Sequence, residues 1–140
     1  MMTSLRIVRS GLLPRRFVRS AEDAYRVLRP LAQGLDREHF WRLDLNSRDR
    51  LLGCELVSVG TLTASFAQPR EVFKGALLSN ACKVIVAHSH PSGDSRPSQA
   101  DRQATRQLIL AGCLLQVELV DHLILADDGY FSFKKARLLL

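Results

Sequence analysis

Two histidines and one aspartate are the residues of this sequence that most clearly point to chemistry. His88 and His90 are separated by one residue, and Asp101 follows eleven positions after the second histidine. Two neutral imidazoles and a carboxylate are a common ligand set for a catalytic Zn²⁺, which keeps its fourth position for water. The residue types and their spacing therefore predict a zinc site with one ion per chain.

The segments around these residues are expected to bring the three side chains together. The apolar run immediately before His88 predicts a buried strand, and alternation along a strand puts His88 and His90 on one face. Prolines and a glycine in residues 91–97 favour a turn, and a helix that begins near Ser98 carries Asp101 in its first turn. A strand end, a loop and a helix start thus converge on one point.

Ser98 and Asp101 also have a purely structural explanation. The pattern Ser-x-x-Asp fits a capping box, in which Ser98 caps the helix and the side chain of Asp101, at the third helical position, accepts from the Ser98 amide. A His-x-His pair is by itself a weak signal, because surface and packing histidines are common. The combination of paired histidines at a strand end, a Pro/Gly turn and a carboxylate at the start of the next helix favours the metal site.

The spacing of His88, His90 and Asp101 resembles the signature of the JAMM metalloproteases, which also have a serine at the position of Ser98. Over residues 20–134 the sequence is similar to the RadC-like proteins of the JAB/MPN superfamily. The similar segments are residues 59–62, 69–73, 80–81, 87–94 and 119–122. The resemblance implies a mixed sheet flanked by helices, similar to the cytidine deaminase-like arrangement. It also implies zinc-dependent cleavage of an amide bond in a peptide or protein substrate.

Some features depart from the RadC-like pattern. Ser89 stands where these proteins usually have asparagine, and it matches the form common among deubiquitinating JAMM enzymes. Asn46 and Asp49 stand where the pattern has aspartate and asparagine, respectively. Longer RadC proteins carry an N-terminal helix-hairpin-helix region, which we do not expect in this chain. A DNA-repair role that depends on that region is therefore not implied.

The resemblance also implies catalytic roles for two residues that do not bind the metal. JAMM enzymes use a glutamate, placed where a helix leads into a strand, to take and return a proton, and Glu38 occupies the matching place. The less favoured candidates are Glu55, inside an expected strand, and Glu71, in the first turn of an expected helix. Ser98 would stabilise an oxyanion, by resemblance alone, with the helix cap as its alternative.

The other two histidines are not expected to bind metal. His122 alternates with Val120 and Ile124 in an apolar stretch, so a hydrogen-bonded core histidine is the favoured interpretation. His39 is expected at the surface, without a functional role.

The order of the expected elements predicts a layered α/β fold. Helices are expected over residues 20–34, with an interruption at Pro30, over residues 69–80, and over residues 98–112, where Gly112 ends the last one. Strands are expected over residues 38–45, 50–59, 84–87, 115–125 and 130–133. Residues 46–49 predict a hairpin turn between the first two strands.

The charge pattern predicts two parts of unequal size. Residues 1–30 carry seven arginines and two acidic residues, or +5 of the net charge of +6. We expect residues 1–19 to form an extended basic arm with one short strand, and residues 20–140 to form the JAB/MPN domain. Such an arm can contact nucleic acid or an acidic partner, and a solvated basic face is the alternative. Deleting residues 1–18 is expected to leave the thermal midpoint nearly unchanged.

The bulk composition limits the remaining function classes. At 140 residues and 46% hydrophobic, the chain is expected to be one compact domain. No apolar run approaches the roughly 18 residues of a membrane span, so no membrane contact is expected. Cys54, Cys82 and Cys113 lie in apolar stretches and predict buried free thiols in a cytoplasmic protein.

A zinc metallopeptidase or isopeptidase is the leading function. A RadC-like DNA-associated factor that binds nucleic acid or protein without cleaving peptides is the alternative, together with a metal-dependent nuclease. The sequence leaves the substrate and the oligomeric state open.

Overall fold

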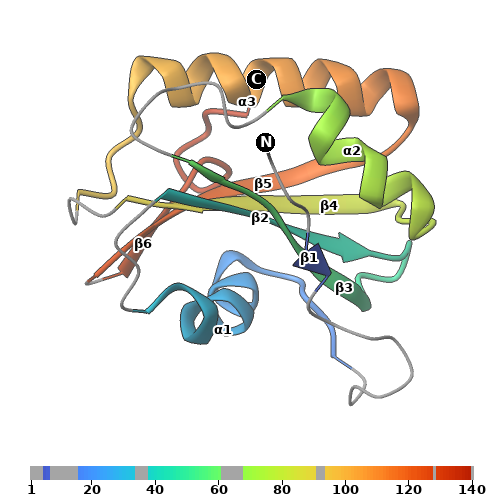
Figure 1. Cartoon of the computed structure of the whole chain (residues 1–140), viewed down its shortest axis with the longest axis horizontal. Helices are drawn as coiled ribbons and strands as arrows, with labels where there is room; N and C mark the ends of the chain where they lie inside the picture. Colours follow the sequence, from blue (N-terminus) through green and yellow to red (C-terminus); the bar gives the residue numbers. More distant parts are fainter. Residues whose placement is uncertain are drawn as a thin grey trace.

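The computed structural model describes residues 5–6 (backbone only), 16–33, 38–60, 68–90, 94–127 and 129–139. Its strands form a six-stranded sheet in the order β1-β3-β2-β4-β5-β6. Helix α1 covers one face of this sheet, and helices α2 and α3 cover the other (Figure 1). The expected α/β class, a mixed sheet flanked by helices, is confirmed.

The chain alternates between strands and helices in the way the sequence predicted. The strands are β1 (Leu5–Arg6), β2 (Glu38–Leu45), β3 (Leu51–Gly60), β4 (Lys83–Ser89), β5 (Glu118–Ala126) and β6 (Gly129–Ser132). The helices are α1 (Ala21–Ala32), α2 (Pro69–Leu78) and α3 (Gln99–Leu115). β4 and β5 pair in parallel, while the other neighbouring strands pair antiparallel. A parallel pair needs a crossover connection, which α3 provides.

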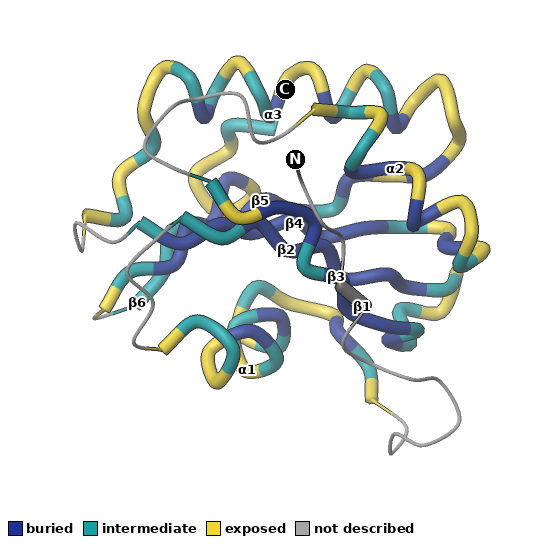
Figure 2. The backbone as a smooth tube through the Cα atoms, viewed as in Figure 1, coloured by how far each residue is buried: buried dark blue, intermediate teal, exposed yellow. Residues whose placement is uncertain are grey.

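The sheet carries an apolar core on each face, so its central strands are dark along most of their length in Figure 2. The core on the α1 side includes Leu28, Trp41, Leu43, Ile85 and Leu123. The core on the side of α2 and α3 includes Phe40, Val72, Phe73, Val86 and Leu108. Burial on both faces explains why the central strands are predominantly apolar in sequence.

A charged cluster is buried between the sheet and α2. Arg42 donates to both carboxylate oxygens of Asp44 at 2.6 and 3.0 Å, and its Nη1 lies 2.6 Å from Glu55 Oε1. Burial opposes the charge of Arg42, but the hydrogen bonds and charges of Asp44 and Glu55 raise the pKa of its guanidinium above the ordinary value. A Cβ atom at Gly75 would lie 2.7 Å from Arg42 Nη2, so α2 can pack this closely only because residue 75 has no side chain.

The expected hairpin turn joins β2 to β3. Asn46 Oδ1 accepts hydrogen bonds from the amides of Arg48 and Arg50, both at 2.9 Å. Asp49 adopts a φ of 67°, and its carboxylate lies 2.7 Å from Lys83 Nζ on β4. Two of the three residues that depart from the RadC-like pattern therefore have a structural role here: Asn46 organises the turn, and Asp49 binds the neighbouring strand β4.

The predicted interruption of the first helix at Pro30 was wrong. Pro30 lies inside α1, which continues to Ala32 with Gln33 as its C-cap residue. The missing N–H of Pro30 removes a single backbone donor near the end of the helix, while the buried Ala24 and Leu28 keep α1 on the sheet. The proposed end at Gly34 lies outside the described residues.

The predicted end of the third helix at Gly112 was also wrong. Gly112 is buried inside α3, which ends only where Gln116 adopts a left-handed φ of 59°. A Cβ atom at residue 112 would lie 2.4 Å from the carbonyl oxygen of Val117 and 3.3 Å from the ring of Phe73. This glycine therefore allows the backbone after α3 and the Phe73 ring of α2 to approach the helix closely, and it does not terminate the helix.

The cysteines differ from the expectation drawn from composition. Of the three cysteines, Cys54 is buried, but Cys82 and Cys113 are exposed, so burial of all three was a wrong prediction. Among the described helices, none combines the length and the apolar character needed to cross a membrane.

Residues 16–18, which were expected in a separate arm, belong to the folded domain. Their backbone pairs with residues 49–51, for example through a 2.8 Å hydrogen bond from the Val18 amide to the Asp49 carbonyl. Val18 is only 2% exposed and lies in the core on the α1 side. β1 in turn pairs with β3. A boundary after residue 19 therefore does not separate an arm from the domain, and removal of residues 1–18 would cut into the core.

We predict that Val18→Ala lowers the free energy of unfolding by about 1–3 kcal/mol, because two buried methyl groups are lost. Urea denaturation measures this change. Val59 is the matched control, since it is 41% exposed, and Val59→Ala should change stability by no more than about 0.5 kcal/mol. Equally small effects of the two substitutions would show that residues 16–18 are dispensable after all.

Candidate metal centre

His88, His90 and Asp101 come together at the carboxyl end of β4. His88 Nε2 lies 2.9 Å from His90 Nε2 and 3.2 Å from Asp101 Oδ1. His90 Nε2 lies 3.6 Å from Asp101 Oδ2, and the ligand atoms offered by the three residues are all within 4.8 Å of one another. The strand, loop and helix start thus deliver the three side chains to one point. The expected turn residues 91–93 lie outside the described residues.

The site is buried on one side and accessible on the other. His88 is fully buried, with its ring stacked on Phe40 at a centroid distance of 6.3 Å and an interplanar angle of 7°. Asp101 is 5% exposed, whereas the side chain of His90 retains 16% of its surface. A ligand from solvent therefore reaches the group from the side of His90.

One hydrogen bond determines which nitrogen of His90 carries the proton. His90 Nδ1 lies 2.7 Å from the carbonyl oxygen of Asp94. A carbonyl oxygen can only accept, so Nδ1 must be the protonated nitrogen of this imidazole. In the neutral ring Nε2 is then unprotonated, and its lone pair faces His88 and Asp101.

Asp101 supplies the negative charge of the group. Its Oδ2 accepts a 2.8 Å hydrogen bond from the Ser98 amide, and its own amide donates to Ser98 Oγ at 3.1 Å, which completes the expected capping box. The hydrogen bond from the Ser98 amide favours the charged form of this carboxylate. The carboxylate is therefore ionised at neutral pH.

His122 is the hydrogen-bonded core histidine that the sequence predicted. It is 1% exposed, and its Nε2 and Nδ1 lie 2.8 Å from His88 Nδ1 and 2.7 Å from Thr105 Oγ1. Burial, together with the neighbouring His88, lowers the pKa of His122 well below its ordinary value. The contact with His88 and the role of Thr105 were not predicted. The position of Thr105, four residues after Asp101 on the same face of the helix, was the available signal in the sequence.

The strand register brings Glu38 toward the same group. β2 pairs antiparallel with β4, with Phe40 opposite His88. Continued by two residues, the register places Glu38 opposite His90, and alternation puts it on the same face as Phe40. Glu38 is half-buried at the start of β2.

The two competing glutamates are engaged elsewhere. Glu55 belongs to the buried cluster, where its carboxylate lies 2.6 Å from Arg42 Nη1. Glu71 lies in the first turn of α2, 3.3 Å from Lys74 Nζ. The preference for Glu38 over these two residues rests on the strand register and on these alternative partners.

Comparison with known proteins places the chain in a family. Residues 18–138 match the family model described as RadC-like JAB domain. The chain belongs to this family. It is 44% identical over 127 residues to a UPF0758 protein of Moorella thermoacetica, covering 91% of this chain and 56% of that protein. It is 41% identical over 120 residues to a UPF0758 protein of Chlorobium phaeovibrioides, covering 86% and 54%.

A UPF0758 protein of Methanococcoides burtonii is 40% identical over 122 residues, which cover 87% of this chain and 53% of that protein. The chain thus spans about half the length of the curated relatives it matches. The family match begins at Val18, which agrees with the burial of that residue in the core of this RadC-like JAB domain.

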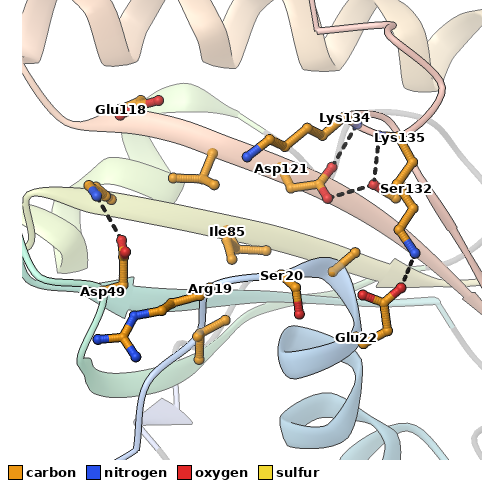
Figure 3. A pocket seen from close by; sticks show the side chains of 14 residues that line it. Arg19, Ser20, Glu22, Asp49, Ile85, Glu118, Asp121, Ser132, Lys134 and Lys135 are labelled. Atoms are coloured by element: carbon orange, nitrogen blue, oxygen red, sulfur yellow. Dashed lines mark hydrogen bonds and ion pairs between the residues drawn. The ribbon is translucent and has the colours of Figure 1, made fainter.

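This RadC-like JAB domain also has a cavity of about 540 Å³ on the α1 face of the sheet (Figure 3). Its lining does not include the three candidate ligands. Two of its acidic side chains have hydrogen-bond donors: Lys135 bonds Glu22, and Asp121 accepts from the Ser132 hydroxyl at 2.6 Å and from the Lys134 amide at 3.0 Å. The cavity is therefore separate from the metal centre.

We predict that Ser98→Ala lowers the free energy of unfolding by about 1 kcal/mol, because the helix loses its side-chain cap. Ser20 provides a matched control far from the metal centre, since its hydroxyl accepts from the Asp23 amide at 3.1 Å, the same distance as in the cap of α3. Thermal denaturation of Ser20→Ala should show a similar loss. An unchanged stability of Ser98→Ala would contradict the capping role.

Proposed function

We propose that this protein is a zinc-dependent hydrolase of the JAMM type that cleaves amide bonds in a peptide or protein substrate. The observation that carries the proposal is the convergence of His88 Nε2, His90 Nε2 and the Asp101 carboxylate at 2.9–3.6 Å. With both Nε2 atoms unprotonated, these nitrogens and the carboxylate oxygens form a group of acceptors that a cation would stabilise. Membership of the RadC-like JAB domain family suggests a metallohydrolase, and the peptidase activity is the finer part of the proposal.

The chemistry of the donor set fits a catalytic zinc ion. Two imidazole nitrogens and one carboxylate oxygen form a recurrent ligand set of catalytic zinc, and three protein ligands leave one position open. Zinc bound there would polarise a substrate carbonyl and acidify a water molecule. The exposed edge of His90 gives substrate a way to that position.

Glu38 is the proposed general base. Its carboxylate would take a proton from the attacking water and return it to the leaving nitrogen of the amide. The β2–β4 register supports this role, because it pairs Phe40 with His88 and its continuation would bring Glu38 toward His90, the side from which substrate would enter. Glu38 would contact water and substrate, and would not be a metal ligand.

Ser98 is the proposed oxyanion donor. In the capping box its oxygen accepts the Asp101 amide through a lone pair, and the hydroxyl still carries its own proton. That proton can be donated to the oxygen of the tetrahedral intermediate. The helix cap and the oxyanion role, which were expected as alternatives, are therefore compatible for this side chain.

The zinc site predicts about one equivalent of Zn²⁺ per chain in the purified protein, measured by elemental analysis after dialysis. The double substitution His88→Ala/His90→Ala removes two of three ligands and should abolish stoichiometric zinc. His39→Ala is the control, because this half-buried histidine lies outside the cluster. One equivalent of zinc in the double variant would show that the ligands lie elsewhere.

For Glu38→Gln we predict full zinc content and a native fold, with turnover reduced by about 10²- to 10⁴-fold, since the amide cannot accept the proton. Turnover is measured on a fluorogenic peptide library, with a DNA duplex as a second substrate. Glu71→Gln, at a half-buried glutamate paired with Lys74 on α2, is the control and should retain activity.

The outcomes of this experiment separate the proposals for the site. Full activity of Glu38→Gln would assign the base to another residue, and loss of zinc would make Glu38 a ligand. Metal-dependent cleavage of the duplex without peptide cleavage would replace the peptidase with a nuclease.

A further inference from the structure

A chain of buried hydrogen bonds runs behind the metal centre. His88 Nδ1 lies 2.8 Å from His122 Nε2, and His122 Nδ1 lies 2.7 Å from Thr105 Oγ1. The Thr105 hydroxyl donates to the main-chain carbonyl of Asp101 at 2.8 Å. His122 and Thr105 are each 1% exposed. The chain therefore links two of the three candidate ligands away from solvent.

The direction of every bond in this chain follows from its last member. The Asp101 carbonyl can only accept, so it takes the single proton of the Thr105 hydroxyl. Thr105 Oγ1 must then accept from His122, whose Nδ1 is therefore protonated. In a neutral His122 the other nitrogen, Nε2, is an acceptor, and His88 Nδ1 must supply the proton between the two rings.

The surroundings of His122 favour the neutral ring. Phe133 stacks on it at a centroid distance of 4.7 Å and an interplanar angle of 8°, and the edge of Phe40 lies against it at 6.1 Å. A buried imidazolium between apolar rings would lose its hydration without a carboxylate bonded to it. Both ring nitrogens are already satisfied in the neutral form, by His88 and by Thr105.

We propose that His122 and Thr105 are positioning residues that hold His88 in the tautomer with a protonated Nδ1. This tautomer leaves His88 Nε2 unprotonated and directed toward His90 and Asp101. Neither residue would touch the metal or the substrate, and both act through His88. The inference rests on the zinc site proposed above. It adds two residues behind the ligands that select the tautomer of His88 able to bind zinc.

The strand that carries His122 is itself fixed from the opposite face of the sheet. Asp121 Oδ1 accepts the His122 amide at 2.7 Å, and Asp121 Oδ2 accepts the Ser132 hydroxyl at 2.6 Å. Figure 3 shows Asp121 and Ser132 on the cavity side, where they join β5 to β6. The backbone of His122 is thereby held in place, which a positioning role requires.

Zinc affinity in a chelator competition tests the proposal without any measurement of activity. His122→Phe keeps an aromatic ring but no acceptor, and it should weaken zinc binding by about 10- to 100-fold. Thr105→Val is close to isosteric and removes the hydroxyl, so it should weaken binding by about 10-fold, while Thr105→Ser should restore it. Ser20→Ala is the control, because it removes a hydrogen-bonded hydroxyl far from the metal centre and should leave zinc affinity unchanged.

Nitrogen NMR of the imidazole rings gives a readout that a merely structural role would not produce. In zinc-loaded protein, His88 is expected to have a protonated Nδ1. In metal-free protein, His122 is expected to have a protonated Nδ1 and an unprotonated Nε2, which tests the chain independently of zinc. If His122→Phe fails to fold, Thr105→Val and these spectra decide the question.

The outcomes separate this inference from the proposed function. Absence of zinc binding by the wild-type protein would overturn the metal site itself. Equal zinc affinity of folded Thr105→Val and the wild type, or a protonated Nε2 on His122, would overturn the positioning role while the metal site stands.

Discussion

Parallel pairing of β4 with β5 forces the chain to leave the sheet and return, and α3 makes that crossing. The return path begins at the carboxyl end of β4, so the first turn of α3 lies directly beside His88. Parallel pairing also aligns β5 with β4, with His122 level with Val86 and on the face that α3 covers. The candidate ligands and the residues behind them are thus neighbours because of a single topological constraint.

The face of the sheet under α2 and α3 carries two polar groups within one apolar core. Arg42, Asp44 and Glu55 satisfy one another beneath α2, and the histidine group lies farther along β2 and β4. Within the part of the chain that the structure describes, no buried side-chain nitrogen or oxygen lacks a hydrogen-bond partner. Such complete satisfaction is costly to disturb, since an orphaned group loses its hydration without compensation. The arrangement therefore specifies side-chain positions more narrowly than apolar packing alone.

The sequence was sufficient for features encoded over a few neighbouring residues. Strand alternation, the Pro/Gly turn and the Ser-x-x-Asp pattern placed His88, His90 and Asp101 on a strand end and a helix start. It was insufficient where the local structure depends on a residue far away in the sequence. By residue type, Gly112 predicts a helix end, because its packing against Phe73 depends on the fold. The arginines around Val18 predict a solvent-exposed arm, although Val18 is buried in the core. The bond between His88 and His122 depends on the β4–β5 register, which one sequence does not encode locally.

The capping box of α3 gives Asp101 two tasks that draw on the same carboxylate. Oδ2 accepts a hydrogen bond from the Ser98 amide while Oδ1 faces His88. Formation of the first turn of α3 and assembly of the three candidate metal ligands are therefore coupled. The free energy of forming this helical turn and the free energy of cation binding are thermodynamically linked. A cation that binds the carboxylate favours the wound turn, and fraying of that turn lowers the affinity for the cation by the same factor. The local stability of α3 thus becomes a quantity by which mutations remote from the ligands can tune metal occupancy.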